Sequence, residues 1–157
     1  MSTISADWIN PFILATTEIF KDIVGVEPKL SKPYVKQTDE PLFDISGIIG
    51  LTGEAVGSIA FSLPKQTALK IVSKFIGEEV LGLSADTRDA IGELTNIIAG
   101  RVKKIFYEKK IHIKISIPNV IVGKEHTISS AKGTSTIVIP FECELGDFAV
   151  QISLKKG

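Results

Sequence analysis

Apolar side chains recur along this chain at two spacings, one typical of helices and one typical of strands. Residues from about 6 to 24 carry them three or four positions apart, which predicts a first helix that Gly25 and Pro28 end. Pro64 is expected in the first position of a second helix, which Gly77 closes. A third helix, the longest, is expected from near Asp86 or Thr87 to about Glu108. The apolar stripe of the first helix is Ile9, Phe12, Ile13, Phe20 and Ile23.

Apolar residues at alternate positions predict strands elsewhere in the chain. Two pairs of alternating segments are separated by turn residues, Thr52-Gly53 and Gly146-Asp147, so we expect two antiparallel hairpins. A further segment after the third helix alternates in the same way and predicts a strand with one buried face. The predicted strands span residues 43–49, 55–63, 111–117, 137–143 and 148–154.

This order of elements nearly repeats itself. Each half offers a long helix, a strand region containing a proline (Pro28 and Pro118) and a terminal hairpin, with the second helix inserted between the halves. Hairpin-joined strands favour a mostly antiparallel sheet with helices packed on it. We therefore predict an α/β (α+β) fold with internal pseudo-symmetry, forming a single domain over residues 1–157.

Composition and charge narrow the classes of function. With 44% hydrophobic and 23% charged residues, the 157-residue chain has the composition of one globular domain with a real core. Its 18 basic and 18 acidic residues cancel, which leaves no overall field to hold a nucleic acid or an anionic membrane. No apolar run is long enough for a membrane span, and no signal peptide is evident. Cys143 is the only cysteine, so we expect it to fill the core of a cytoplasmic protein in a reducing compartment.

The third helix is the candidate for chemistry. On a helical wheel, Ile91, Leu94, Ile98, Val102 and Ile105 share one face, which is expected to be buried. Opposite this stripe lie Asp89, Glu93, Asn96 and Gly100, with Lys103 and Lys104 flanking them one turn on. Glu93 and Asn96 are three residues apart and are therefore neighbours on the outward face.

Two glycines support a functional interpretation of this helix. Gly92 and Gly100 lie within it, where each costs about 1 kcal/mol relative to alanine. Because Gly100 faces outward and serves no core, close approach by another molecule would explain it.

The chemistry of the outward pair limits what it can do. An amide such as that of Asn96 is neither a nucleophile nor a base at neutral pH, but it can hold and orient a water molecule. Glu93 can accept a proton or pair with a partner's cation. No nucleophile or metal is expected nearby, so the pair predicts half of an active centre whose other half lies on another protein. Amides are known to orient water for attack on phosphoryl groups.

The sequence resembles a known family, the CheX, CheC and FliY phosphatases of bacterial chemotaxis, and the CheX members most closely. The resemblance covers nearly the whole chain. It rests on NPFILATTEIF in the first helix, DISGIIGLTGEAVGSIAFSL in the first hairpin and IGELTNIIAGRVKK in the third helix. The last segment contains the family's Glu-x-x-Asn signature as Glu93 and Asn96.

The resemblance implies a phosphatase that accelerates hydrolysis of the aspartyl phosphate of a CheY-type response regulator. Asn96 would orient the attacking water, and Glu93 would pair with the regulator's active-site lysine. The regulator would supply the magnesium, and this chain would need no cofactor of its own. The resemblance also implies a CheC-like fold and a homodimer joined through sheet edges. The remaining expected partner contacts are Asp89, Gly92, Gly100, Lys103 and Lys104.

Two details distinguish this chain within that family. CheC-like members carry the signature twice, whereas the first helix here has Glu18 and Lys21 at that spacing, which implies a single site. Arg101 occupies a position where relatives often have a small or polar residue, and the wheel places it near the margin of the buried stripe.

The sequence offers three other interpretations: a docking module, a metal-dependent enzyme and a phosphate-binding loop. A non-catalytic module could dock a receiver domain through the third helix without hastening hydrolysis. A metal-dependent enzyme could use His112 and His126, although His112 alternates outward on a strand and a surface role is favoured. The glycines from Gly47 to Gly57 lack the lysine and the following helix of a phosphate-binding loop. Hairpin turns and close packing of a helix on the sheet explain them better.

Overall fold

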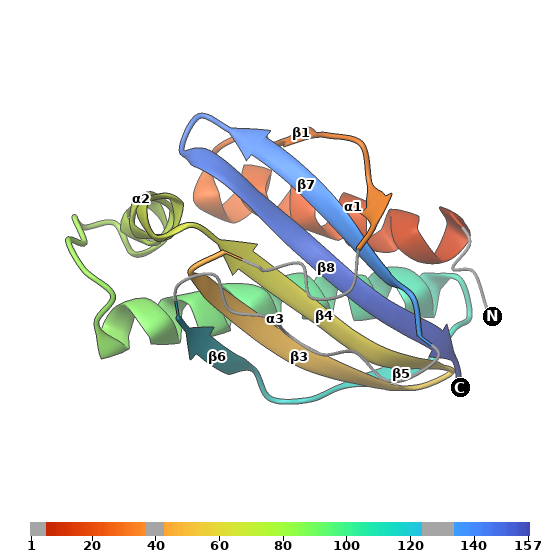
Figure 1. Cartoon of the computed structure of the whole chain (residues 1–157). Helices are drawn as coiled ribbons and strands as arrows, with labels where there is room; N and C mark the ends of the chain where they lie inside the picture. Colours follow the sequence, from red (N-terminus) through yellow and green to blue (C-terminus); the bar gives the residue numbers. More distant parts are fainter. Residues whose placement is uncertain (1–5, 37–42, 124–133) are drawn as a thin grey trace.

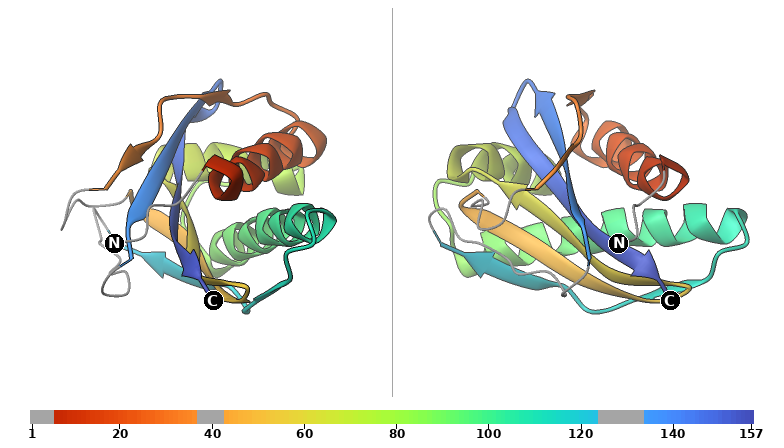
Figure 2. Two further views of the ribbon diagram at one scale, coloured as in Figure 1. Left: turned by 90° about the vertical axis from the view of Figure 1, so that its right-hand side faces the viewer. Right: turned by 45° about the vertical axis from the view of Figure 1, so that its right-hand side comes forward.

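Two long helices lie side by side on one face of an antiparallel sheet, and a shorter helix lies at the end of that sheet (Figures 1 and 2). The computed structural model describes residues 6–36, 43–123 and 134–157. In chain order the elements are α1 (Ala6–Ile19), the π-helical turn η1 (Phe20–Val24), β1 (Lys29–Leu30), β2 (Tyr34–Val35), β3 (Ile45–Gly53), β4 (Ala55–Leu63), α2 (Lys65–Ile76), α3 (Ala85–Glu108), β5 (Ile113–Ile115), β6 (Asn119–Val122), β7 (Thr136–Cys143) and β8 (Gly146–Lys156).

The two halves of the chain form one sheet, and each half pairs its short edge strands with the hairpin of the other half. Its order is β1-β7-β8-β4-β3-β5, with β2 also on β7 and β6 also on β3, and every pairing is antiparallel. The short strands β1 and β2 of the first half therefore pair with the second hairpin, whereas β5 and β6 of the second half pair with the first hairpin. The predicted pseudo-symmetric, mostly antiparallel fold is confirmed, with β4 and β8 paired at its centre.

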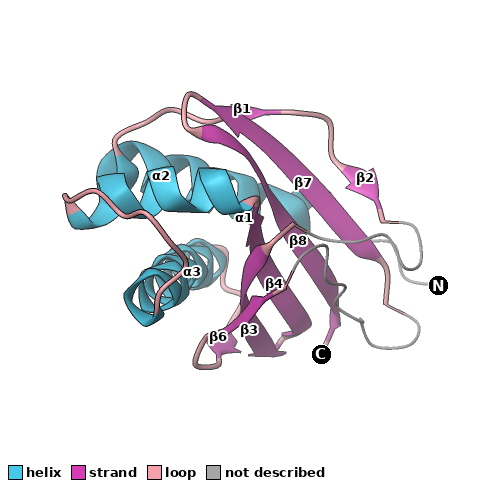
Figure 3. Ribbon diagram, turned by 60° about the vertical axis from the view of Figure 1, so that its left-hand side comes forward, coloured by secondary structure: helices cyan, strands magenta, loops and turns pink. Residues whose placement is uncertain are grey.

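The helices and the sheet form separate layers (Figure 3), and the core lies between the helices and one face of the sheet. Four phenylalanine rings form its centre under α1 and η1. Phe20 stacks on Phe148 with ring centroids 4.4 Å apart, Phe148 stacks on Phe141 at 5.1 Å, and Phe61 meets Phe148 edge-on at 5.5 Å. Phe61, Phe141 and Phe148 alternate with outward residues along β4, β7 and β8, as the sequence pattern requires.

The helices end close to the predicted positions, and two details differ. Gly25 ends η1 and Gly77 ends α2, both with positive φ, of 83° and 80°. Pro64 is extended (φ −61°, ψ 151°) and caps α2 from outside rather than occupying its first turn. Ile23, predicted to be buried, is 39% exposed, because the π-helical turn changes the residue spacing and turns Val24 inward instead.

No helix in the described ranges is long and apolar enough to span a bilayer.

Both predicted hairpins form, whereas the strand prediction after α3 fails in part. The strand β3 continues to Gly53, so Thr52 and Gly53 lie in β3 and not between the two strands. The second turn consists of Glu144 and Leu145, because Cys143 already pairs with Gly146. The predicted strand over residues 111–117 forms only from Ile113 to Ile115. Pro118 interrupts the ladder, Ile117 is 85% exposed, and a separate strand, β6, follows.

Candidate functional site

Helix α3 begins at a well-formed cap. The Ser84 hydroxyl accepts a hydrogen bond from the Thr87 backbone N–H at 3.3 Å, and the Thr87 hydroxyl donates to the carbonyl of Gly82 at 2.7 Å. A serine cap of this kind stabilises a helix by about 1 kcal/mol. The first turn of α3 is therefore fixed relative to the preceding loop.

Contacts with α1 hold the C-terminal half of α3 in place. The Phe106 ring packs against the rings of Trp8 and Phe12, with centroids 5.6 and 5.8 Å away. Arg101 donates from Nη1 to the Glu18 carboxylate at 3.1 Å. Arg101 thus points to α1 and pairs with Glu18, which with Lys21 of η1 has the signature spacing.

At its centre, α3 touches the sheet through Thr95. This side chain is fully buried, and its hydroxyl donates to the carbonyl of Ile91 at 2.6 Å. It lies directly over Gly47 of β3, where an added Cβ would fall 2.9 Å from the Thr95 Cβ and still closer to its hydroxyl. Glycine at this position lets the helix approach the strand, which confirms the expected close packing of helix on sheet.

The residues on either side of Thr95 point away from the sheet. Glu93 and Asn96 are both exposed, whereas Leu94 is buried. Neither polar side chain forms a hydrogen bond or an ion pair with any residue that the structure describes. The predicted outward orientation of the pair is therefore observed, and both side chains are available to another molecule.

The other candidate contact residues fall into two groups. Asp89, Lys103 and Lys104 are exposed on α3, and a Cβ added to Gly100 would meet nothing within 4 Å. Gly92 is different because it is buried, and an added Cβ would lie 3.2 Å from Val120 and 3.8 Å from Pro118. Packing of α3 against β6 explains Gly92, which corrects the expectation that it faces a partner.

The outward face of α3 includes one further residue, Tyr107, that the sequence pattern was not used to predict. Tyr107 is 65% exposed and extends the outward stripe of α3 by one turn beyond Lys103. Its spacing of 11 residues from Asn96 is three helical turns, so the same wheel could have identified it. The members of this outward stripe are Asp89, Glu93, Asn96, Gly100, Lys103 and Tyr107.

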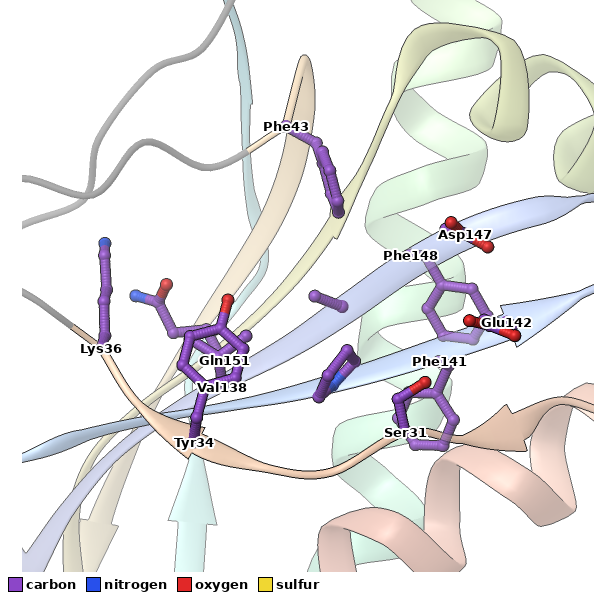
Figure 4. A pocket seen from close by; sticks show the side chains of 12 residues that line it. Ser31, Tyr34, Lys36, Phe43, Val138, Phe141, Glu142, Asp147, Phe148 and Gln151 are labelled. Atoms are coloured by element: carbon purple, nitrogen blue, oxygen red, sulfur yellow. The ribbon is translucent and has the colours of Figure 1, made fainter.

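The face of the sheet opposite the helices holds a groove of about 250 Å³ that is unrelated to this stripe (Figure 4). Strands β7 and β8 form its floor through Val138 and Gln151, which alternate with the core-facing residues, and Tyr34 and Phe43 overhang it. The sheet therefore separates this groove from α3.

The structure also places the residues considered for metal binding. The His112 ring lies edge-on to Tyr107 with centroids 5.3 Å apart, and His126 lies outside the described residues. Within residues 6–36, 43–123 and 134–157, no cluster of three or more His, Cys, Asp or Glu side chains could hold a metal ion. Cys143 is half-buried against the core, and its thiol contacts the Gly146 carbonyl at 3.3 Å.

The arrangement on α3 suits recognition of another molecule's reactive group. Glu93 and Asn96 sit one turn apart on a helix held at its cap, at the sheet and at α1. The carboxylate can pair with a cation, and the amide can both donate to and accept from a water molecule. The outward stripe contains no serine, cysteine or histidine, so it lacks the Ser–His and Cys–His pairs that commonly activate a nucleophile.

Comparison with known sequences agrees with this arrangement. A family model described as chemotaxis phosphatase CheX matches residues 45–142, which include β3, β4, all of α3 and most of β7. The chain is also 33% identical over 150 residues to the CheY-P phosphatase CheX of Thermotoga maritima, covering 95% of this chain and 96% of that protein.

Solved structures give the same result at the level of the fold. A CheC-like superfamily protein from Shewanella sp. PV-4 superposes with a TM-score of 0.90 at 29% identity, covering 97% of this chain and 99% of that one. CheX of Borrelia burgdorferi, in a crystal structure of its complex with CheY, BeF3 and Mg²⁺, superposes with a TM-score of 0.80 at 29% identity, covering 97% and 100% of the two chains.

Proposed function

The chain belongs to the CheX family of chemotaxis phosphatases, and we propose that it accelerates hydrolysis of the aspartyl phosphate on a CheY-type response regulator. One observation carries the proposal. Glu93 and Asn96 are exposed side by side on a rigid helix, without a hydrogen-bonding partner among the described residues. The pair can orient a water molecule and bind a cation, so it can complete a partner's active centre. The phosphoryl group and the Mg²⁺ would have to come from that partner.

In the proposed reaction, Asn96 enters the regulator's phosphorylation site and fixes a water molecule in line with the phosphorus. The water oxygen bonds to phosphorus while the bond from phosphorus to the aspartyl carboxyl oxygen breaks. The products are the aspartate carboxylate and inorganic phosphate, which takes up the protons of the water. Positioning of this kind reduces the entropic part of the barrier without any covalent chemistry on the phosphatase.

Glu93 is proposed to hold the partner rather than the water. Its carboxylate would pair with the lysine of the regulator's active site and so align the two proteins. The regulator would bring the Mg²⁺, in keeping with the presence of BeF3 and Mg²⁺ in the CheX–CheY complex of Borrelia burgdorferi. The reaction would take place in the cytoplasm.

The test is the decay of a phosphorylated CheY-type regulator in excess Mg²⁺, with and without this protein. We expect faster decay with the intact chain, a loss of about 100-fold in the rate constant for Asn96→Ala, and binding weakened about tenfold or more for Glu93→Gln. Asn10→Ala and Glu27→Ala are matched controls, because both residues are exposed and lie on α1 and in the loop after η1 rather than on α3.

The outcomes separate the enzyme from its main alternative. If the intact chain binds the phosphorylated regulator but leaves its decay unchanged, the protein is a docking module and the phosphatase proposal fails. If decay quickens and both site variants retain full activity, the roles given to Asn96 and Glu93 are wrong.

We also propose that the chain forms a homodimer through an edge of its sheet. Strand β6 pairs only with β3 within the described chain, and its residues Ile121 and Val122 are 39% and 38% exposed. An edge with exposed apolar side chains favours pairing with another strand. Sedimentation equilibrium should show a dimer, and Ile121→Lys should shift it toward monomer if β6 is the edge involved.

A further inference from the structure

A second hollow borders the outward stripe of α3 near its C-terminal end. It is a groove of about 480 Å³, and we call it the Lys103–Tyr107 groove after the two α3 residues that form one wall. Residues 111–114, which lead into and include most of β5, form the other wall, and the turn between β3 and β4 closes the end. The lining residues are Gly53, Glu54, Lys103, Tyr107, Ile111, His112, Ile113 and Lys114.

The walls of this groove are held in place by specific contacts. The Glu54 carboxylate accepts a hydrogen bond from the His112 backbone N–H at 2.6 Å, and the Glu54 N–H donates to the His112 carbonyl at 3.0 Å. Gly53, with φ 102°, lets the turn approach, since an added Cβ would lie 2.7 Å from that carbonyl. The groove is therefore preformed, and a ligand would not have to order it.

The chemistry of the groove is apolar inside and cationic at its rim. Ile111, Ile113 and the Tyr107 ring supply apolar surface. Lys103 and Lys114 are exposed and form no ion pair with any residue in the described parts of the chain. The only carboxylate in the lining, that of Glu54, is already occupied by the His112 backbone. The groove thus suits an apolar side chain that is flanked by carboxylates.

The groove continues the proposed binding face. Lys103 and Tyr107 follow Asn96 by 7 and 11 residues on the same stripe, or about 10 and 16 Å along the helix axis. A standard protein interface covers roughly 800 Å² on each partner, which is wide enough to include both points. A protein that places its phosphorylation site over Asn96 would therefore also cover this groove.

We propose that the Lys103–Tyr107 groove is a second contact for the regulator bound at Glu93 and Asn96, and that an apolar side chain of the regulator, flanked by carboxylates, enters it. This inference rests on the proposed function, which supplies the partner. A phosphorylation site that binds Mg²⁺ is itself rich in carboxylates, since Mg²⁺ prefers oxygen ligands, so the cationic rim faces a partner of opposite charge. The groove would set affinity and partner choice, and Asn96 would set the rate of the chemical step.

The experiment uses a CheY-type regulator activated with BeF3 and Mg²⁺ as the binding probe, and the phosphorylated form for kinetics. Tyr107→Ala and Lys103→Glu should each raise Kd and KM about tenfold while kcat changes less than about twofold. Lys32→Glu is the matched control, because Lys32 is exposed near the opposite edge of the sheet. Urea unfolding of each variant checks that the fold is intact.

Two results would overturn the inference. One is an unchanged Kd in both groove variants when Asn96→Ala has lost its activity; this leaves the proposed function standing. The other is a change in self-association of the groove variants without a change in Kd, which would assign the groove to a second copy of the chain. Conversely, if the intact protein does not hasten decay but the groove variants weaken binding tenfold, the groove stands and the phosphatase proposal fails.

Discussion

Gly47 of β3 and Thr95 of α3 occupy adjoining positions that leave no room for a Cβ on the strand. The Thr95 Cβ would lie 2.9 Å from a Cβ added to Gly47. Because Thr95 stands between Glu93 and Asn96 in the sequence, this contact sets how far the turn of α3 that carries the proposed site stands from the sheet. A substitution in β3, on the far side of the helix from the partner, should therefore affect the site.

Gly47→Ala should destabilise the protein by about 1–3 kcal/mol, because the new methyl group overpacks a closed contact. It should also lower phosphatase activity, since α3 must shift to relieve the clash. Urea unfolding and regulator dephosphorylation measure the two effects. Adding Thr95→Ala should recover part of the lost stability; no recovery in the double variant would show that the clash lies elsewhere.

Gly100→Ala should separate stability from activity. Open space surrounds an added Cβ at this position, and alanine in a helix is favoured over glycine, so the free energy of unfolding should rise by about 0.5–1 kcal/mol. If the regulator approaches the helix closely here, its dephosphorylation should slow despite the greater stability. Full activity in a stabilised variant would contradict a contact at Gly100.

Gly92→Val should destabilise the protein by about 1–3 kcal/mol, because Val120 and Pro118 already close the space beside it. Gly100→Val is the matched control in the same helix and should cost nothing, since valine has a better helix propensity than glycine. Equal effects of the two substitutions on urea unfolding would mean that packing against β6 is not the reason for Gly92.

Arg101→Ala should leave dephosphorylation within about twofold of the parent, because the guanidinium pairs with Glu18 of α1 rather than facing the partner. Both side chains are partly exposed, so a double-mutant cycle should give a coupling of only about 0.2–1 kcal/mol. The coupling should shrink in 1 M salt. A large loss of activity in Arg101→Ala would place this residue in the regulator interface after all.

Sequence patterns predicted most of the fold because its helices and hairpins each bury one face. The stripe from Ile91 to Ile105 and the alternation along β4 and β8 are local consequences of that burial. The predictions of buried residues and strand bounds fail where the regular spacing of apolar residues is interrupted. At η1 a π-helical turn changes the spacing and exposes Ile23, and at Pro118 the chain leaves one strand and enters another.

For the site, the wheel alone identified the outward pair and the lysines beside it, since a helix with one buried stripe must expose the opposite one. It could not distinguish Gly92 from Gly100, because the difference depends on whether β6 lies alongside the helix. It also could not identify the Lys103–Tyr107 groove, whose walls come from α3, β5 and the turn between β3 and β4.

The sequence by itself thus determined the elements, their buried faces and the two polar side chains on which the proposed chemistry rests, because these follow from period and residue type. Only the tertiary structure decided how the halves exchange their edge strands, where α3 touches the sheet and which glycine faces open space. Those features depend on contacts between residues far apart in the chain, such as Gly47 with Thr95 and Glu18 with Arg101. No local pattern records such contacts, because each partner is compatible with many neighbours until the fold brings them together.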